Sequence, residues 1–170
     1  MTRPKAVLIG APGSGKTTIG TMLAERLGVP LRDTDADVEA VAGKPIGEIF
    51  IDDGEDRFRE LERAAVAAAV AEHDGVLALG GGAVLAAETR ELLAGHTVVY
   101  LKVGLAEAVK RVGLASARPL LVLNPRSHMR RLLEERLPVY EGLGTLRVDT
   151  DGREPAEIVA EIVKALEADA

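Results

Sequence analysis

The chain has 170 residues, of which 47% are hydrophobic and 28% are charged, and its formal net charge is −6. This length and balance are typical of one globular domain. The acidic charge and an aromatic content of only 2% argue against nucleic-acid binding by a broad basic surface or by base stacking. Since the chain contains no cysteine, it has no disulfide, no thiolate metal site and no cysteine nucleophile.

The distribution of apolar residues bears on location and assembly. No run approaches the roughly 18 apolar residues that span a bilayer, and the apolar run near the start is too short for a signal peptide. We therefore expect a cytoplasmic protein that binds no membrane. No long apolar stripe demands a partner, so we also expect a monomer.

Short apolar runs alternate with longer amphipathic segments along the chain. The runs that predict buried strands lie at 5–10, 29–35, 76–82, 96–103 and 145–150. The segments that predict helices lie at 19–27, 54–75, 86–94, 105–112, 128–137 and from 155 onward. This alternation predicts an α/β fold, with a parallel sheet covered on both sides and ligands at the carboxyl ends of its strands.

Two segments interrupt the alternation. We interpret residues 34–62 as a helical insertion that holds a substrate, and residues 113–127 as a lid, because loops that long are usually functional or disordered. A mobile loop without function is the alternative for the second segment. With no internal repeat and no long linker, residues 1–170 are expected to form one domain.

The segment "GAPGSGKT" at 10–17 matches the phosphate-binding pattern G-x-x-x-x-G-K-[ST] between a predicted strand and a predicted helix. Its backbone amides would wrap the β-phosphate of a nucleotide; they belong to Gly13, Ser14, Gly15 and Lys16. The Lys16 ammonium would neutralise the β- and γ-phosphates, and the Thr17 hydroxyl would ligate Mg²⁺. The alternative is a flexible glycine turn that happens to carry a lysine.

The size of the chain and one missing motif narrow the class of nucleotide-binding protein. Guanine-specific proteins usually carry an N-K-x-D segment, whereas the only asparagine here is Asn124, which Pro125 follows. Motor ATPases are much larger. A short P-loop chain with a lid fits a small-molecule kinase that uses ATP and Mg²⁺.

A kinase needs an acceptor pocket, and four features are candidates for it. Arg59 and Glu62 can pair along one helix face, although such a pair at the surface contributes little. The glycines at 80–82 let a ligand approach the backbone, unless they only form a turn. Arg118, in the predicted lid, is placed to stabilise charge on a transferring phosphoryl group. Arg136 is either a further cation of the site or favourably placed at a helix C-terminus.

The stretch "RDTDAD" carries Asp33, Asp35 and Asp37 at every second position. It does not fit a calcium loop, because the sixth and twelfth positions hold Val38 and Lys44 instead of glycine and glutamate. At a strand end, the first two carboxylates would lie about 6–7 Å apart on one side, facing the ligand edge. We expect the third to be solvated or to cap the next helix.

The ordered set of motifs resembles the shikimate kinase family over essentially the whole chain. The matching segments are "GAPGSGKTTIG", "DTD" at 33–35, "FRELE" at 58–62, "LALGGGAV" at 77–84, "RPLL" at 118–121 and "RLPVY" at 136–140. The resemblance implies a three-layer α/β/α fold of the nucleoside monophosphate kinase type, with a five-stranded parallel sheet. It also implies phosphoryl transfer from ATP to the 3-hydroxyl of shikimate, in the pathway that supplies aromatic amino acids.

The resemblance also implies roles for the residues that bind the acceptor. Asp35 would hold ring hydroxyls of shikimate and act on the one that accepts the phosphate. Arg59 and Arg136 would bind its carboxylate, with Glu62 orienting the arginines, and the backbone of Gly81 would contact the substrate. This agrees with the chemistry of a small anionic polyol, whose carboxylate suits arginines and whose hydroxyls suit a carboxylate.

For the nucleotide side, the resemblance implies that Asp33 acts near Mg²⁺, largely through water. Arg118 would meet the nucleotide phosphates as a catalytic group. Thr18 and Arg153 would contact the nucleotide, and Arg111 and Pro155 lie where the family frames the adenine ring. The lid matches the family firmly only at "RPLL".

Two rival functions stay open at the level of the sequence. A small kinase for gluconate or for a nucleoside monophosphate shares the P-loop, and gluconate is also a carboxylated polyol. A nucleotide-dependent interaction module without catalysis is the other rival. It leaves "GGG" and "RPLL" unexplained.

Overall fold

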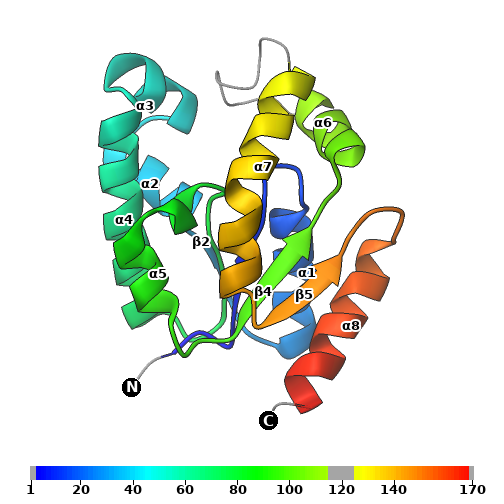
Figure 1. Ribbon diagram of the computed structural model, residues 1–170. Coiled ribbons are helices and arrows are strands. Elements are labelled where there is room, and N and C mark those ends of the chain that lie inside the picture. The colour runs from blue at the N-terminus through cyan, green and yellow to red at the C-terminus, as the bar shows by residue number, and fades with distance from the viewer. Residues whose placement is uncertain (1–2, 115–124, 169–170) are drawn as a thin grey trace.

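The computed structural model describes residues 3–114 and 125–168, which form a parallel five-stranded sheet between two helical layers (Figure 1). The strands are β1 (Ala6–Ile9), β2 (Leu31–Asp33), β3 (Val76–Ala78), β4 (Val98–Lys102) and β5 (Leu146–Asp149). Their order across the sheet is β2-β3-β1-β4-β5, and every neighbouring pair is parallel. This is the sheet that the alternating pattern predicts.

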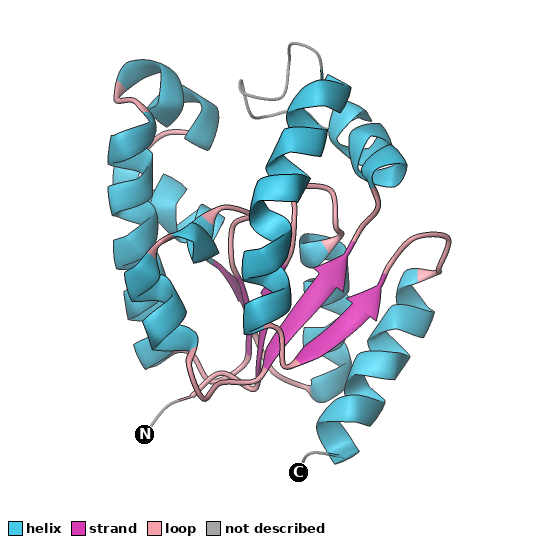
Figure 2. Cartoon of the chain, in the orientation of Figure 1, coloured by secondary structure: helices cyan, strands magenta, loops and turns pink. Residues whose placement is uncertain are grey.

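The helices cover the sheet on both faces, as Figure 2 shows by colour. They are α1 (Lys16–Leu27), α2 (Thr34–Ala42), α3 (Ile46–Asp52), α4 (Glu55–Glu72), the 3₁₀ turn η1 (Ala83–Leu85), α5 (Ala87–Leu93), α6 (Leu105–Leu114), α7 (Pro125–Leu143) and α8 (Pro155–Ala168). Helices α1 and α8 pack on one face, and α4, α5 and α7 cover the other (Figure 1). In the part of the chain described, no helix combines the length and apolarity that a membrane span requires.

Strand β1 shows why a continuous apolar run marks the centre of such a sheet. Its four residues are all buried, and they divide alternately between the two faces. Val7 and Ile9 join the core beneath α4 and α7, whereas Ala6 and Leu8 join the core beneath α1 and α8. A strand with period two and helices on both faces has no polar side to show.

The region at 34–62 adds a small helical layer of its own beside the sheet. Helices α2, α3 and the start of α4 enclose a separate apolar cluster of Val38, Ile46, Ile49 and Phe58. The predicted helical insertion is therefore present as three consecutive helices. Helix α2 begins directly after β2, and Arg59 and Glu62 of α4 lie beside the glycines that follow β3.

The expected strand end at the acidic stretch is wrong, because the chain turns into a helix earlier. Strand β2 stops at Asp33, whose carboxylate accepts a 2.9 Å hydrogen bond from the N–H of Asp35 and so caps α2. Asp35 therefore lies in the first turn of a helix and not on one side of a strand with Asp33. Asp37 caps nothing and instead pairs with Nε of Arg32 at 2.7 Å.

Helix α7 is longer than the predicted helix at 128–137. It starts at Pro125 and continues through Pro138 to Leu143. The buried side chains of Met129 and Tyr140 hold both ends of the helix on the sheet, and this packing outweighs the hydrogen bond that the proline removes. Between Leu114 and Pro125, residues 115–124 of the predicted lid lie outside the described residues.

Candidate active site

The loop between β1 and α1 has the backbone of a phosphate cradle. Gly13 and Gly15 have φ angles of 83° and 92°, a left-handed region that a side chain disfavours. The Ser14 N–H closes the turn onto the carbonyl of Ala11 at 3.0 Å. The ammonium of Lys16 lies over this turn and donates to the Gly10 carbonyl at 2.7 Å. The positive N-terminus of α1 and the lysine thus converge where the motif predicts an anion.

A cavity of about 240 Å³ opens beside this loop and brings together the predicted nucleotide-binding residues. Its wall includes Thr18 from α1, Arg111 from α6, and Arg153 and Pro155 from the segment that leads into α8. Arg111 is fixed by a 2.8 Å hydrogen bond from Nη1 to the carbonyl of Gly13. The cavity therefore continues from the phosphate cradle to the positions where the sequence predicts the adenine.

Two of the glycines that follow β3 leave room for charged side chains from other helices. A Cβ atom on Gly80 would lie 2.6 Å from Oδ1 of Asp35 and 3.0 Å from Oε2 of Glu62. A Cβ atom on Gly82 would lie 2.5 Å from Nη1 of Arg59. Because Cβ atoms essentially never approach so closely, a side chain at either position would displace these charged groups, so the glycines leave them the space that they occupy.

Gly81 lies between the nucleotide side and the acceptor side. A Cβ atom on it would lie 2.9 Å from Cδ of Pro12 in the phosphate loop and 3.2 Å from Nη1 of Arg136 in α7. The glycine segment at 80–82 is therefore surrounded by Asp35, Glu62, Arg59 and Arg136. These are the side chains that the sequence predicts for the acceptor pocket, and they come from three different helices.

The pair between Arg59 and Glu62 is present at 2.7 Å, and it is not the surface ion pair that spacing alone allows. The side chain of Glu62 is only 3% exposed, and that of Arg59 is 21% exposed. Arg59 also lies 5.2 Å above the ring of Phe58. A buried carboxylate of this kind holds the guanidinium in one orientation at the edge of the glycine segment.

Arg136 is buried in the middle of α7, with 8% of its surface exposed. The alternative of a helix C-terminal position is wrong, since the helix runs on to Leu143. In the part of the chain that the structure describes, its buried Nη1 has no hydrogen-bond partner. A buried cationic donor without an acceptor is rare in folded proteins, and an anionic ligand explains it.

The first residues of the acidic stretch lie where β2 leads into α2. Burial raises the pKa of Asp33 above its usual value, and the N–H of Asp35 and the ammonium of Lys16 act in the opposite direction. Thr34, between the two aspartates, is fully buried and accepts a 3.4 Å hydrogen bond from the N–H of Gly80. This threonine, which sequence reasoning missed, joins the start of α2 to the glycine segment. Only its position between the two aspartates signals it.

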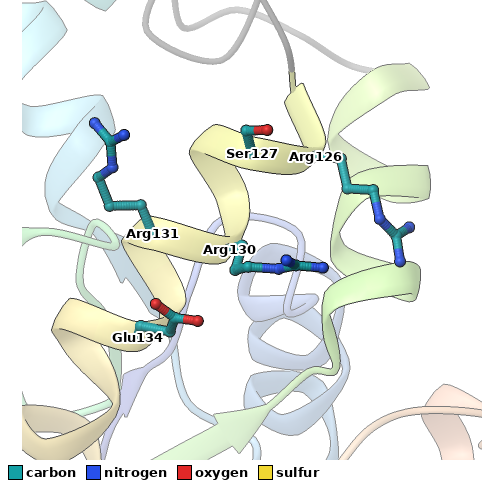
Figure 3. A pocket seen from close by; sticks show the side chains of 5 residues that line it. All are labelled: Arg126, Ser127, Arg130, Arg131 and Glu134. Carbon is teal, nitrogen blue, oxygen red and sulfur yellow. The ribbon is translucent and has the colours of Figure 1, made fainter.

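The outer face of α7 carries a second hollow, of about 410 Å³ (Figure 3). It is lined by Arg126, Ser127, Arg130, Arg131 and Glu134. In Figure 3, Arg131 extends away from Arg126 and Arg130, which point toward α6. These side chains are exposed, in contrast to Arg136 on the inner face of the same helix. The sequence predicts no role for them, and Arg118 of the predicted lid lies outside the described residues.

The sheet order and the phosphate loop define a P-loop kinase fold. The adjoining cluster of two carboxylates and two arginines has the chemistry that suits a small anionic acceptor. Comparison with known proteins gives the family. The family model for shikimate kinase matches residues 12–167. The shikimate kinase of Salinispora tropica is 61% identical over 96% of this chain and 98% of that protein. The shikimate kinase of Thermobifida fusca is 59% identical, over 98% of this chain and 97% of that protein.

Solved structures agree with this assignment. The shikimate kinase of Acinetobacter baumannii, solved in complex with shikimate, superposes with a TM-score of 0.93 at 33% identity and covers 99% of this chain and 95% of its own. The shikimate kinase of Aquifex aeolicus gives a TM-score of 0.84 at 30% identity, over 96% of each chain. A gluconokinase of Sinorhizobium meliloti, at 24% identity and a TM-score of 0.61, shares the fold alone.

The chain belongs to the shikimate kinase family. It is accordingly a phosphotransferase with an alcohol acceptor, and its reaction is that of a shikimate kinase. The resemblance inferred from the ordered motifs is confirmed, and so is the fold of the nucleoside monophosphate kinase type.

Proposed function

We propose that this pocket transfers the γ-phosphoryl group of ATP to the 3-hydroxyl of shikimate, giving shikimate 3-phosphate and ADP. The observation that supports it best is the buried guanidinium of Arg136, whose Nη1 has no acceptor in the described part of the chain. Arg136 lies beside Gly81, and Arg59 lies beside the next glycine, Gly82. Two arginines about one short backbone stretch suit a carboxylate, which accepts paired N–H bonds.

In the acceptor pocket, Arg59 and Arg136 bind the carboxylate of shikimate, and Glu62 keeps Arg59 oriented through its 2.7 Å contact. Asp35, beside Gly80, receives the ring hydroxyls. The backbone of Gly81 contacts the ring. The arginines attract an acid and are left without partners by a neutral sugar, so they contribute selectivity as well as affinity.

On the nucleotide side, the amides of the phosphate loop and Lys16 hold the β- and γ-phosphates, while Thr18 and Arg153 border the cavity for the rest of ATP. Arg118 is proposed to reach the phosphates from the lid. Its catalytic role is to stabilise the charge that develops during transfer.

Thr17 and Asp33 are the residues that would hold Mg²⁺. The hydroxyl of Thr17 is exposed in the first turn of α1, and the carboxylate of Asp33 lies within electrostatic reach of Lys16. Mg²⁺ in kinases is usually bound by one or two side chains together with substrate phosphates and water, so two protein ligands fit this ion. When bound, Mg²⁺ neutralises phosphate charge during transfer.

The main task of the side chains is to position the acceptor hydroxyl against the γ-phosphate. Phosphoryl transfer passes through a loose transition state, so alignment of the hydroxyl with the γ-phosphate and neutralisation of charge dominate the rate. Asp35 either accepts the proton of the 3-hydroxyl or orients that hydroxyl by a hydrogen bond. A single domain at 1–170, a lid at 113–127, a cytoplasmic location and a monomeric state stay predictions from the sequence.

An assay of acceptor-stimulated ADP release tests the proposal. The wild-type chain is given ATP, Mg²⁺ and, in parallel, shikimate, gluconate or a nucleoside monophosphate. We expect saturable ADP release with shikimate and at most background with the others. Preference for gluconate or a nucleotide would overturn the acceptor assignment, and ATP binding without stimulated release would indicate an interaction module.

A further inference from the structure

Tyr140 connects helix α7 to the glycine segment, although neither the acceptor nor the nucleotide site includes it. Only 1% of its surface is exposed, and its hydroxyl donates a 2.5 Å hydrogen bond to the carbonyl of Gly81. Its ring stacks on that of Tyr100, with centroids 5.2 Å apart. The hydroxyl is therefore held in place both by its acceptor and by the packing of its ring.

The carbonyl that Tyr140 holds controls the backbone groups beside it. The peptide bonds of the described residues are trans, so the C=O of Gly81 and the N–H of Gly82 point in opposite directions in one plane. Fixing the carbonyl toward α7 fixes that N–H away from it. Among the hydrogen bonds of the described chain, none uses the N–H of Gly81 or Gly82, so both donors are left for a ligand.

Hydrogen bonds hold the two ends of the glycine segment: the N–H of Gly80 donates to Thr34, and the carbonyls of Gly80 and Gly82 accept from the N–H groups of Ala83 and Leu85. Glycine has the widest backbone freedom of any residue, and three in succession order only at a large entropic cost. Asp35 and Arg59 occupy the space into which side chains at Gly80 and Gly82 would extend. The hydroxyl of Tyr140 supplies the corresponding bond to the carbonyl of Gly81, in the centre of the segment.

Tyr140 also follows Arg136 by one helical turn, so both side chains leave the same face of α7. Arg136 reaches the Cα side of Gly81 while Tyr140 bonds its carbonyl. One helix thus sets the position of a carboxylate-binding cation and of the adjacent backbone donors together. A shift of α7 would misplace both by the same amount.

We propose that the Tyr140 hydroxyl is a positioning group for the acceptor. It holds the Gly81–Gly82 peptide so that its N–H faces the bound shikimate, and it touches neither substrate. This inference rests on the proposed function, because it assumes that the glycine segment contacts the acceptor.

Tyr140→Phe tests the proposal, because it removes the hydroxyl and keeps the ring. The buried carbonyl of Gly81 then loses its donor, which costs enough to shift binding by about tenfold. We expect the KM for shikimate to rise by about that factor, the KM for ATP to stay within about twofold and kcat within about threefold. A urea titration of the same variant measures its free energy of unfolding, so that a loss of stability can be distinguished from the selective rise in the KM for shikimate.

Tyr100→Phe is the matched control, since it removes a hydroxyl from the other ring of the stack. Burial raises the pKa of Tyr100 to about 12, so no charge is lost at neutral pH. We expect both KM values to stay within about twofold of wild type.

Because the chain has 2 tyrosines and no tryptophan, the Tyr100→Phe variant also leaves Tyr140 as the only tyrosine fluorophore. Its emission should then change saturably with shikimate alone.

The outcomes distinguish the inference from the function on which it rests. If wild type phosphorylates shikimate but Tyr140→Phe has an unchanged shikimate KM, or raises both KM values equally, the positioning role is wrong. A Tyr140 emission that does not respond to saturating shikimate would also contradict it. If wild type does not phosphorylate shikimate at all, the proposed function fails first.

Discussion

The nucleotide half and the acceptor half of the pocket are built in different ways. The phosphate cradle comes from one continuous segment at 10–17, and it uses backbone amides, a helix N-terminus and Lys16. The proposed acceptor pocket combines side chains from α2, α4 and α7, which meet around the glycines at 80–82. The first can be recognised as a motif, whereas the second exists only after the chain has folded.

The two halves also determine different properties of the enzyme: the class of reaction and the choice of acceptor. A phosphate cradle recognises a group that every nucleoside triphosphate shares, so it fixes the class of reaction. Side chains from separate helices can be exchanged one at a time, so they decide which acceptor is used. Substitutions in the phosphate cradle should therefore lower activity with every acceptor. Substitutions among the side chains around the glycines should lower activity with shikimate and leave nucleotide binding intact.

Lys16→Ala should have the largest effect. It removes the cation that neutralises the β- and γ-phosphates, and we expect kcat/KM to fall by about a thousandfold or more with any acceptor. Steady-state ADP release at saturating ATP measures it. Turnover near the wild-type value would show that the loop is not the phosphate site.

Asp35→Asn should lower kcat strongly while nucleotide binding survives. The amide keeps the size of the side chain but loses the charge that accepts or orients the acceptor proton, so we expect kcat to fall by about a hundredfold or more. ADP binding, measured by calorimetry, should be unchanged. A variant that turns over at a near-normal rate would remove Asp35 from the chemistry.

Arg136→Gln should raise the KM for shikimate by about 10- to 100-fold, because a charge-assisted contact to the carboxylate is lost. Arg130→Gln, on the outer face of the same helix, is the control and should change neither KM by more than about twofold. Equal effects of the two substitutions would show that general positive charge, and not the buried position, attracts the acceptor.

Asp33→Asn should show a small gain in stability together with a loss of Mg²⁺-dependent activity. Asparagine still caps α2, while the buried charge disappears. Since the pKa of Asp33 is raised by burial, its charged form disfavours folding at neutral pH, and this cost fades as the pH falls through that raised pKa. We expect Tm without Mg²⁺ or nucleotide to rise by about 1–3 °C at pH 7, and the gain to shrink at acidic pH. A lower Tm at pH 7 would contradict this.

Features that depend on local chemistry could be predicted from the sequence. The alternating runs predict the strands because a sheet covered on both faces leaves β1 no polar side. The spacing of the glycines and the lysine in the phosphate loop predicts the conformation of that loop. Arg59 and Glu62, three residues apart, predict their contact, although only the fold shows that Glu62 is buried.

Other features depend on which helices and strands contact each other in the fold. Short stretches of sequence do not reveal those contacts. The alternation of Asp33 and Asp35 suggests a strand. However, the carboxylate of Asp33 accepts a hydrogen bond from the N–H of Asp35 and so caps the start of helix α2. Pro138 suggests a helix end, yet packing of Tyr140 carries α7 past it. Met129, Arg136 and Tyr140 do share one helical face, which is the signal that could have placed Tyr140 in the site.

We propose that the glycine segment and its surrounding side chains form an acceptor pocket separate from the phosphate cradle. Gly82→Ala tests it most directly, because the added Cβ would lie 2.5 Å from Nη1 of Arg59, which Glu62 prevents from moving freely. Gly142→Ala in α7, where nothing lies within 4 Å of the new Cβ, is the matched control. Calorimetric titration of both variants with shikimate and with ADP should show shikimate binding lost only in Gly82→Ala and ADP binding retained in both. Normal shikimate binding by Gly82→Ala, or joint loss of both ligands in a folded protein, would contradict the account.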